Sequence, residues 1–89
     1  MKLERSDIEK FYYLHTRFNE LSSNIGVVAN QKEFDKKMKP IIHRIKHIKG
    51  AKCYKTSNTL VTFIGNEETT FVRIQDTNDL IGRTFRRFM

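Results

Sequence analysis

The 89-residue chain is long enough for one small domain, and its hydrophobic content of 38%, with seven Phe and three Tyr, is too high for a disordered tail. A charged fraction of 30%, without an apolar stretch near the ~18 residues of a spanning helix, argues against a membrane protein. The charged N-terminus does not resemble a signal peptide, and the one cysteine, Cys53, permits no internal disulfide. We therefore expect a single domain over 1–89 in the cytoplasm.

The net charge of +7 comes from one window of the sequence. Residues 36–66 hold eight Lys or Arg and no Asp or Glu, whereas residues 1–35 hold five basic and six acidic residues and residues 67–89 hold four of each. Charge concentrated in this way creates a local field that can hold a polyanion and steer its approach. The pattern therefore indicates an anionic partner.

A first helix is predicted over 7–24. Ser6 and Glu9 match the capping box, in which a hydroxyl and a carboxylate satisfy the unpaired amides of a helix start. Apolar or aromatic residues then recur at spacings of three and four, and Gly26 offers a left-handed residue that can end the helix. The stripe consists of Ile8, Phe11, Tyr12, His15, Phe18, Leu21 and Ile25.

A second helix is predicted over 31–49, with Asn30 as its N-cap and Lys49-Gly50-Ala51 at its end. Its apolar residues fall on one stripe at about 100° per residue. Pro40 removes a helical hydrogen bond and crowds the preceding turn, so the segment forms either one kinked helix or two helices that meet near Lys39. The stripe keeps its phase across Pro40, which slightly favours a kink.

From Cys53 onward the apolar period changes to two, which predicts strands over 53–56, 59–64 and 69–75. The last two form an antiparallel hairpin over 59–75, and the first lies beside it. Leu80, Ile81, Phe85 and Phe88 could form one face of a short terminal helix, which Gly82 weakens. The expected fold class is α+β: two N-terminal helices, the second kinked or split at Pro40, packed on a small three-stranded antiparallel sheet, with a short C-terminal helix.

The second helix carries the main candidate site. Opposite its apolar stripe lie lysines and histidines without the Glu partners that ordinary solvated faces contain, so neighbouring charges repel unless an anion neutralises them. Most of these cations are Lys, which contacts phosphates as a point charge, and Arg44 is the obvious candidate for reading a base. The expected phosphate contacts are Lys32, Lys36, Lys39, His43, Lys46 and Lys49, with Arg44, Lys52 and Lys55 beside them and a second patch at Arg83, Arg86 and Arg87.

Two tyrosines could stack on unpaired bases. Tyr54 lies between Lys52 and Lys55, and Tyr13 falls on the polar side of the first helix. Both could instead close the edge of a small core. Packing is the favoured role for Tyr13, and the two roles are balanced for Tyr54.

His43 and His47 form an HxxxH pair, a spacing that can place two imidazoles on one metal, with His15 or Cys53 as a third ligand. The surrounding lysines would repel a divalent cation, and no carboxylate lies nearby in sequence, so we expect neither a metal nor another cofactor. The pair could also act as acid and base in RNA cleavage. Because no catalytic motif supports that chemistry, we expect a non-enzymatic protein.

Three resemblances bear on this interpretation. The order helix, three strands, helix over 31–89 resembles the double-stranded-RNA-binding domain, but Asp79-Leu80-Ile81-Gly82 stand where that family opens its last helix with lysines. Splitting the second helix at Pro40 gives an order similar to winged-helix DNA-binding domains, although the wing at 65–68 would be acidic. In size, charge and use of Lys, Asn, Ile and Phe, the chain resembles small early accessory proteins of bacteriophages.

The predicted function is nucleic-acid binding, dominated by the phosphate backbone and weakly sequence-selective, with RNA slightly favoured over DNA, in a regulatory or accessory role. The first alternative, implied by the phage resemblance, is an inhibitor that binds an acidic host protein, such as a defence nuclease or toxin, directly or through RNA. The second is a structural subunit of a larger particle. Self-association is also expected to be possible, because a small sheet leaves edge strands available for pairing.

Overall fold

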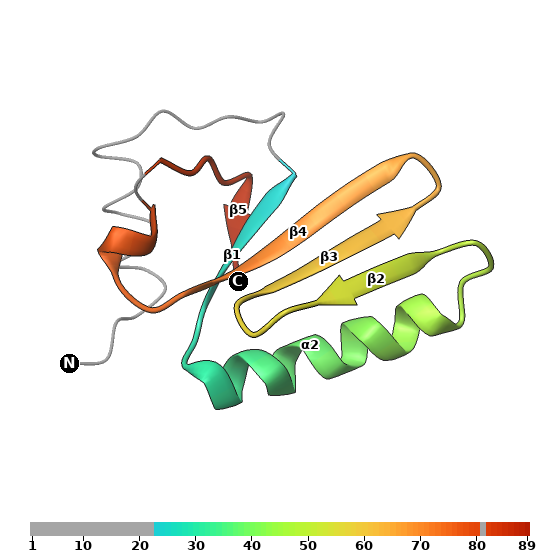
Figure 1. Cartoon of the computed structure of the whole chain (residues 1–89), viewed down its shortest axis with the longest axis horizontal. Coiled ribbons are helices and arrows are strands. Elements are labelled where there is room, and N and C mark those ends of the chain that lie inside the picture. Colours follow the sequence, from blue (N-terminus) through green and yellow to red (C-terminus); the bar gives the residue numbers. More distant parts are fainter. Residues whose placement is uncertain (1–22, 81) are drawn as a thin grey trace.

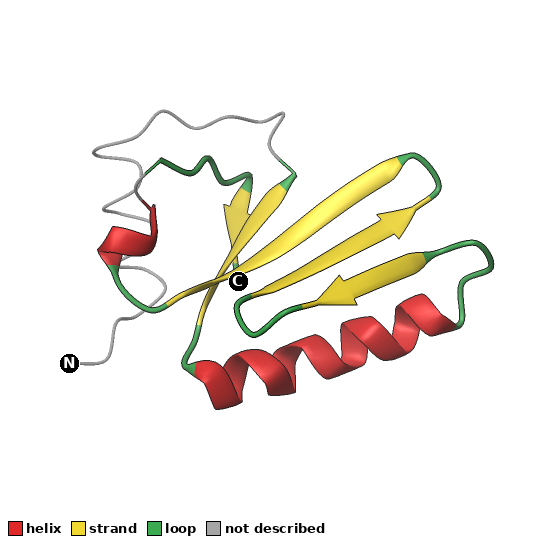
Figure 2. Ribbon diagram, in the orientation of Figure 1, coloured by secondary structure: helices red, strands yellow, loops and turns green. Residues whose placement is uncertain are grey.

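The computed structural model describes residues 23–80 and 82–89, and within them the chain forms a mixed sheet of five strands, one α-helix and one 3₁₀ turn (Figure 1). Figure 2 shows the helix lying along one side of the sheet. In chain order the elements are β1 (Asn24–Val28), α2 (Gln31–Lys46), β2 (Lys52–Lys55), β3 (Thr59–Ile64), β4 (Glu67–Ile74), the 3₁₀ turn η1 (Thr77–Leu80) and β5 (Arg87–Phe88).

The sheet has the strand order β2-β3-β4-β1-β5. Strands β2, β3 and β4 form an antiparallel meander, and β1 then joins β4 in parallel, with Asn24 opposite Thr70 and Val28 opposite Ile74. The short strand β5 pairs in parallel with the other side of β1. The first described strand therefore lies inside the sheet, where both of its neighbours come from later in the chain.

Helix α2 packs on one face of the sheet, against β2 and β3. Phe34 and Met38 are fully buried there, in a cluster with Val27 of β1, Leu60 of β3 and Phe71 of β4. The helix begins at Asn30, whose side chain accepts a hydrogen bond from the Glu33 amide at 2.8 Å and donates one to the Glu33 carboxylate at 2.7 Å. This reciprocal cap confirms the helix start predicted from the sequence.

The C-terminal segment covers part of the opposite face. Leu80, Phe85 and Phe88 are buried there against Val72 and Ile74 of β4. The Asp79 carboxylate accepts hydrogen bonds from the backbone amides of residues 75 and 76 at 2.7 and 3.1 Å, which fixes the turn after β4. Each face of the sheet thus has its own apolar cluster.

The predicted fold class is wrong in its sheet and in its helices. Asn24, the last residue of the predicted first helix, belongs to strand β1 with Ile25 and Gly26, and Gly26 does not have the positive φ expected of it. The sheet is mixed and five-stranded rather than antiparallel and three-stranded. A short apolar run such as this one fits either a helix end or a buried strand, and pairing with β4, far along the chain, selects the strand. The rest of the predicted helix, residues 7–22, lies outside the described residues.

The predicted terminal helix is also wrong. Residues 77–80 form a 3₁₀ turn, Gly82 adopts a positive φ of 74°, and Arg87–Phe88 form β5. In contrast, the hairpin agrees with its prediction as β3 and β4, and the segment around Pro40 is one continuous α-helix rather than two. The exposed position of Pro40 leaves the buried side of α2 intact.

We predict that Gly26→Ala destabilises the fold. A Cβ at this position would lie 2.6 Å from Cε1 of the buried Phe88 ring, so the ring or the strand must shift. Overpacking costs about 1–3 kcal/mol and removing a strand glycine returns about 0.5–1, so the free energy of unfolding should fall by about 1–2 kcal/mol in urea denaturation.

Phe88→Ala provides the control for this prediction, because it removes the ring atoms that the new Cβ would meet. The double variant should lose less stability than the sum of the two single variants. Strictly additive losses would show that a Cβ at position 26 does not meet the Phe88 side chain.

Candidate nucleic-acid interface

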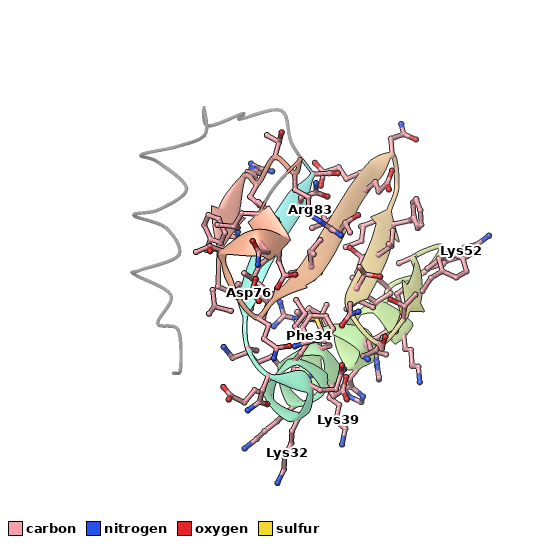
Figure 3. All side chains as sticks on the ribbon, turned by 60° about the vertical axis from the view of Figure 1, so that its left-hand side comes forward. Lys32, Phe34, Lys39, Lys52, Asp76 and Arg83 are labelled. Atoms are coloured by element: carbon pink, nitrogen blue, oxygen red, sulfur yellow. The ribbon has the colours of Figure 1, made fainter. Side chains whose placement is uncertain are left out.

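The exposed side of α2 forms an outer basic face, which consists of Lys32, Lys36, Lys39, His43 and Lys46. All five residues are exposed. Figure 3 shows Lys32 and Lys39 pointing away from the sheet, whereas Phe34 on the same helix points toward it. The helical period thus separates the cations from the core, as the sequence pattern predicted.

The outer basic face is electrostatically unbalanced. Within the described part of the chain, none of its lysine side chains forms an ion pair or a hydrogen bond. At 1.5 Å per residue, Lys32 and Lys46 lie about 21 Å apart along the axis, close to the rise of six base pairs in duplex DNA at 3.4 Å each. The face therefore offers a row of solvated cations about as long as a half-turn of duplex.

The two histidines at the end of α2 are arranged for helix termination. His47 is the C-cap, and its Nδ1 lies 2.9 Å from the backbone carbonyl oxygen of His43, with the ring centroids 4.6 Å apart. An imidazole N–H at this position can donate that hydrogen bond. His43 itself is exposed on the outer basic face. No group of three or more His, Cys, Asp or Glu among the described residues is placed to hold a metal ion.

Lys55 differs from the helix lysines because it is paired within the fold. Its ammonium donates to a carboxylate oxygen of Asp35 at 2.7 Å and to the Thr56 carbonyl oxygen at 3.1 Å, and it lies 5.4 Å from the centroid of the Phe34 ring. The hydrogen bond from Lys55 lowers the pKa of Asp35 below its ordinary value of 3.8, opposed in part by desolvation. Lys55 therefore ties β2 to α2 and is less available to a ligand than the outer lysines.

Beyond the helix, the predicted contacts Lys49, Lys52 and Tyr54 do not lie on one surface. Lys49 lies exposed between α2 and β2, and Lys52 and Tyr54 alternate along β2 with Cys53 and Lys55, which face the helix. Lys52 and Tyr54 therefore lie on the face of the sheet that points away from α2. Tyr54 is 59% exposed, and its ring packs edge-on against Phe63, with centroids 6.0 Å apart and the planes at 77°.

The structure brings Arg44 together with two residues of the C-terminal patch. Arg44 lies on the flank of α2, and it lines one groove with Arg86 and Arg87, which enter from the other side at β5. The groove occupies about 1020 Å³ on the helix side of the sheet. Arg83 is exposed near η1 and is not part of this lining.

The groove contains residues that sequence reasoning missed. Thr62 and Thr69 contribute hydroxyls, and Ile64 and Phe71 contribute apolar surface. These residues come from the hairpin, and they meet the arginines only because β1 and β5 extend the sheet past β4. No local sequence signal marks such an assembly. The candidate contacts Tyr13 and His15 lie outside the described residues.

Comparison with protein-family models, with curated proteins and with solved structures found no match to this chain. In the described segments, no helix is long and apolar enough to cross a membrane.

The Asp35–Lys55 ion pair predicts a pH dependence of stability. Because the folded-state pKa of Asp35 is lowered, its contribution is fully present above the ordinary value of 3.8 and is lost as the pH falls through the folded value. The stability difference between wild type and Asp35→Asn should be largest near neutral pH and should disappear at strongly acidic pH, as measured by urea denaturation.

Lys55→Gln should shift the Asp35 carboxyl titration, followed by NMR, back up toward its ordinary pKa. Lys46→Gln, which removes the same charge from the outer basic face, should leave that titration nearly unchanged. Equal shifts in both variants would mean that general positive charge, and not the Lys55 contact, lowers the pKa.

Proposed function

We propose that this protein binds nucleic acid by its phosphate backbone, along the outer basic face of α2. The observation that carries the proposal is the row of exposed cations on one continuous helix, whose lysines lack acidic partners within the described residues. Phosphates would relieve the repulsion between these side chains and release counterions, which favours binding. Lys49, exposed just after the helix, would extend the contact, whereas Lys52 lies on the other face of the sheet.

The residue types favour holding a backbone over reading a sequence. The cations of the outer basic face are four lysines and one histidine, and a lysine ammonium meets a phosphate oxygen as a point charge. The bidentate recognition of base edges relies on Arg, Asn and Gln, which this face does not present. Binding should therefore be weakly sequence-selective, in keeping with an accessory or regulatory factor, with RNA slightly favoured over DNA.

The salt dependence of binding tests the proposal. If the face and its extension engage about five to six phosphates of a 16-base-pair duplex, the logarithm of the association constant should fall with the logarithm of salt at a slope of about −5. The triple variant K36Q/K39Q/K46Q should bind more weakly and show a slope shallower by about 2.7, measured by fluorescence anisotropy. Gln has nearly the helix propensity of Lys, so the fold should be retained.

A matched control removes three positive charges from the balanced N-terminal part of the sequence, as K2Q/R5Q/K10Q. It has the same net charge as the triple helix variant and should keep most of the wild-type slope. A salt-insensitive affinity, or equal loss in both variants, would overturn the proposal. If duplex and single strands fail to bind at all, an acidic protein becomes the better candidate for the partner of this face.

A further inference from the structure

The groove that holds the three arginines is chemically different from the outer basic face. Its walls are the flank of α2, with Ile41, Arg44 and Ile45, and the sheet from β3 to β5. The side of α2 that faces β2 is closed by the Lys55–Asp35 ion pair and by a hydrogen bond of 2.6 Å from the Gln31 side chain to the Ser57 carbonyl oxygen. The helix is thus tied to one half of the sheet, and the groove lies along its other flank.

The lining combines an apolar floor with a positively charged rim. The described lining includes three arginines and one glutamate, Glu68, which gives a net charge of +2. Within the described residues, the side chains of these arginines form no ion pair or hydrogen bond. The apolar side chains of the groove are the more exposed Ile41, Ile64 and Met89, with the buried Ile25, Ile45 and Phe71 beneath them.

Two hydroxyls lie among these apolar groups. Thr62 is buried, and its hydroxyl donates to the Thr69 carbonyl oxygen at 3.3 Å, so it is satisfied within the sheet. The Thr69 side chain is partly exposed in the same groove. A ligand that suits this site is flat and apolar on its faces, has hydrogen-bonding edges and carries an anionic group.

We infer that this groove binds an unpaired nucleotide of a single strand, with the base on the apolar floor and its phosphates at Arg44, Arg86 and Arg87. The inference rests on the proposed function and adds its substrate class. In a duplex the faces of each base are covered by its neighbours, so only an unpaired or extruded base can enter. Guanidinium planes also stack on bases, which suits arginine at this rim better than lysine.

The path of the strand follows from the position of Arg44. At 100° per residue, Arg44 lies between the outer basic face and the apolar stripe that contains Ile41 and Ile45. A backbone held by the outer lysines therefore passes Arg44 before a base reaches the groove. The two sites would act on one ligand, with the lysines retaining the backbone and the groove selecting strands that have a free base.

The experiment compares three fluorescein-labelled probes on the full chain: dT12, a 12-residue abasic strand with the same phosphates, and a 12-base-pair duplex. Wild type should prefer dT12 over the abasic strand by about tenfold, the contribution of roughly one stacked base. Ile64→Gln, at a floor position that is 43% exposed, keeps the net charge and should lower dT12 affinity about threefold. It should leave duplex affinity unchanged.

The variant R44Q/R86Q/R87Q should reduce the dT12-to-abasic ratio toward one. Its matched control, K36Q/K39Q/K46Q, loses the same charge and should weaken all three probes while keeping the ratio. Folding of each variant is checked by its urea midpoint, and Ile64→Gln remains the test if the arginine variant is unstable.

The outcomes separate this inference from the proposed function. Equal wild-type affinity for dT12 and the abasic strand, with steep salt dependence retained, would overturn the groove inference and leave the proposed function standing. An unchanged ratio in both groove variants would also overturn it, and would indicate another occupant such as an acidic peptide. Failure of all probes to bind would overturn both.

Discussion

The packing of Phe34 and Met38 against the sheet is the contact on which the rest of this architecture depends. These two side chains are fully buried, so they fix the rotation of α2 about its own axis. Once that rotation is set, the helical period places Lys32, Lys36 and Lys39 in solvent and puts Arg44 on the flank. A turn of 100° about the axis would bring charged side chains into the core, which costs several kcal/mol per unpaired charge. The core thus determines where the cations point.

The lateral position of α2 has a second consequence. Hydrogen bonds from Gln31 and Lys55 tie the helix to the β2 side, and the groove lies along its other flank. Strands β1 and β5 then supply the far half of the groove. Because β5 is only two residues long, its position depends on pairing with β1 and on the burial of Phe85 and Phe88 behind the sheet. The groove is therefore a product of tertiary packing.

The difference between local contacts and contacts of distant segments explains which features could be read from the sequence. Helix α2, its Asn30 cap and its lysine face are encoded within a few turns of chain, so periodicity was sufficient. Strand β1 is encoded by a run too short to distinguish strand from helix, and its partner Thr70 lies far along the chain from Asn24. The same reason hid the groove that Arg44 and Arg86 both line, and the ion pair that Lys55 forms with Asp35. Contacts between distant segments decided β1, the groove and the Lys55 ion pair, whereas local contacts of Asp79 and the positive φ of Gly82 decided the terminal segment.

The distribution of lysine and arginine between the two surfaces bears on how they would share a ligand. The outer basic face uses lysines, whose strongly hydrated ammonium groups attract phosphates at a distance and lose little by staying in water. The groove uses arginines beside isoleucine and phenylalanine, where a weakly hydrated planar cation can approach apolar surface at smaller cost. Charge on the helix would then govern the rate of association and its salt dependence, whereas contacts in the groove would govern dissociation. A chain with the same +7 placed at random could provide the first effect but not the second, because selecting an unpaired base requires apolar surface and cations at one site.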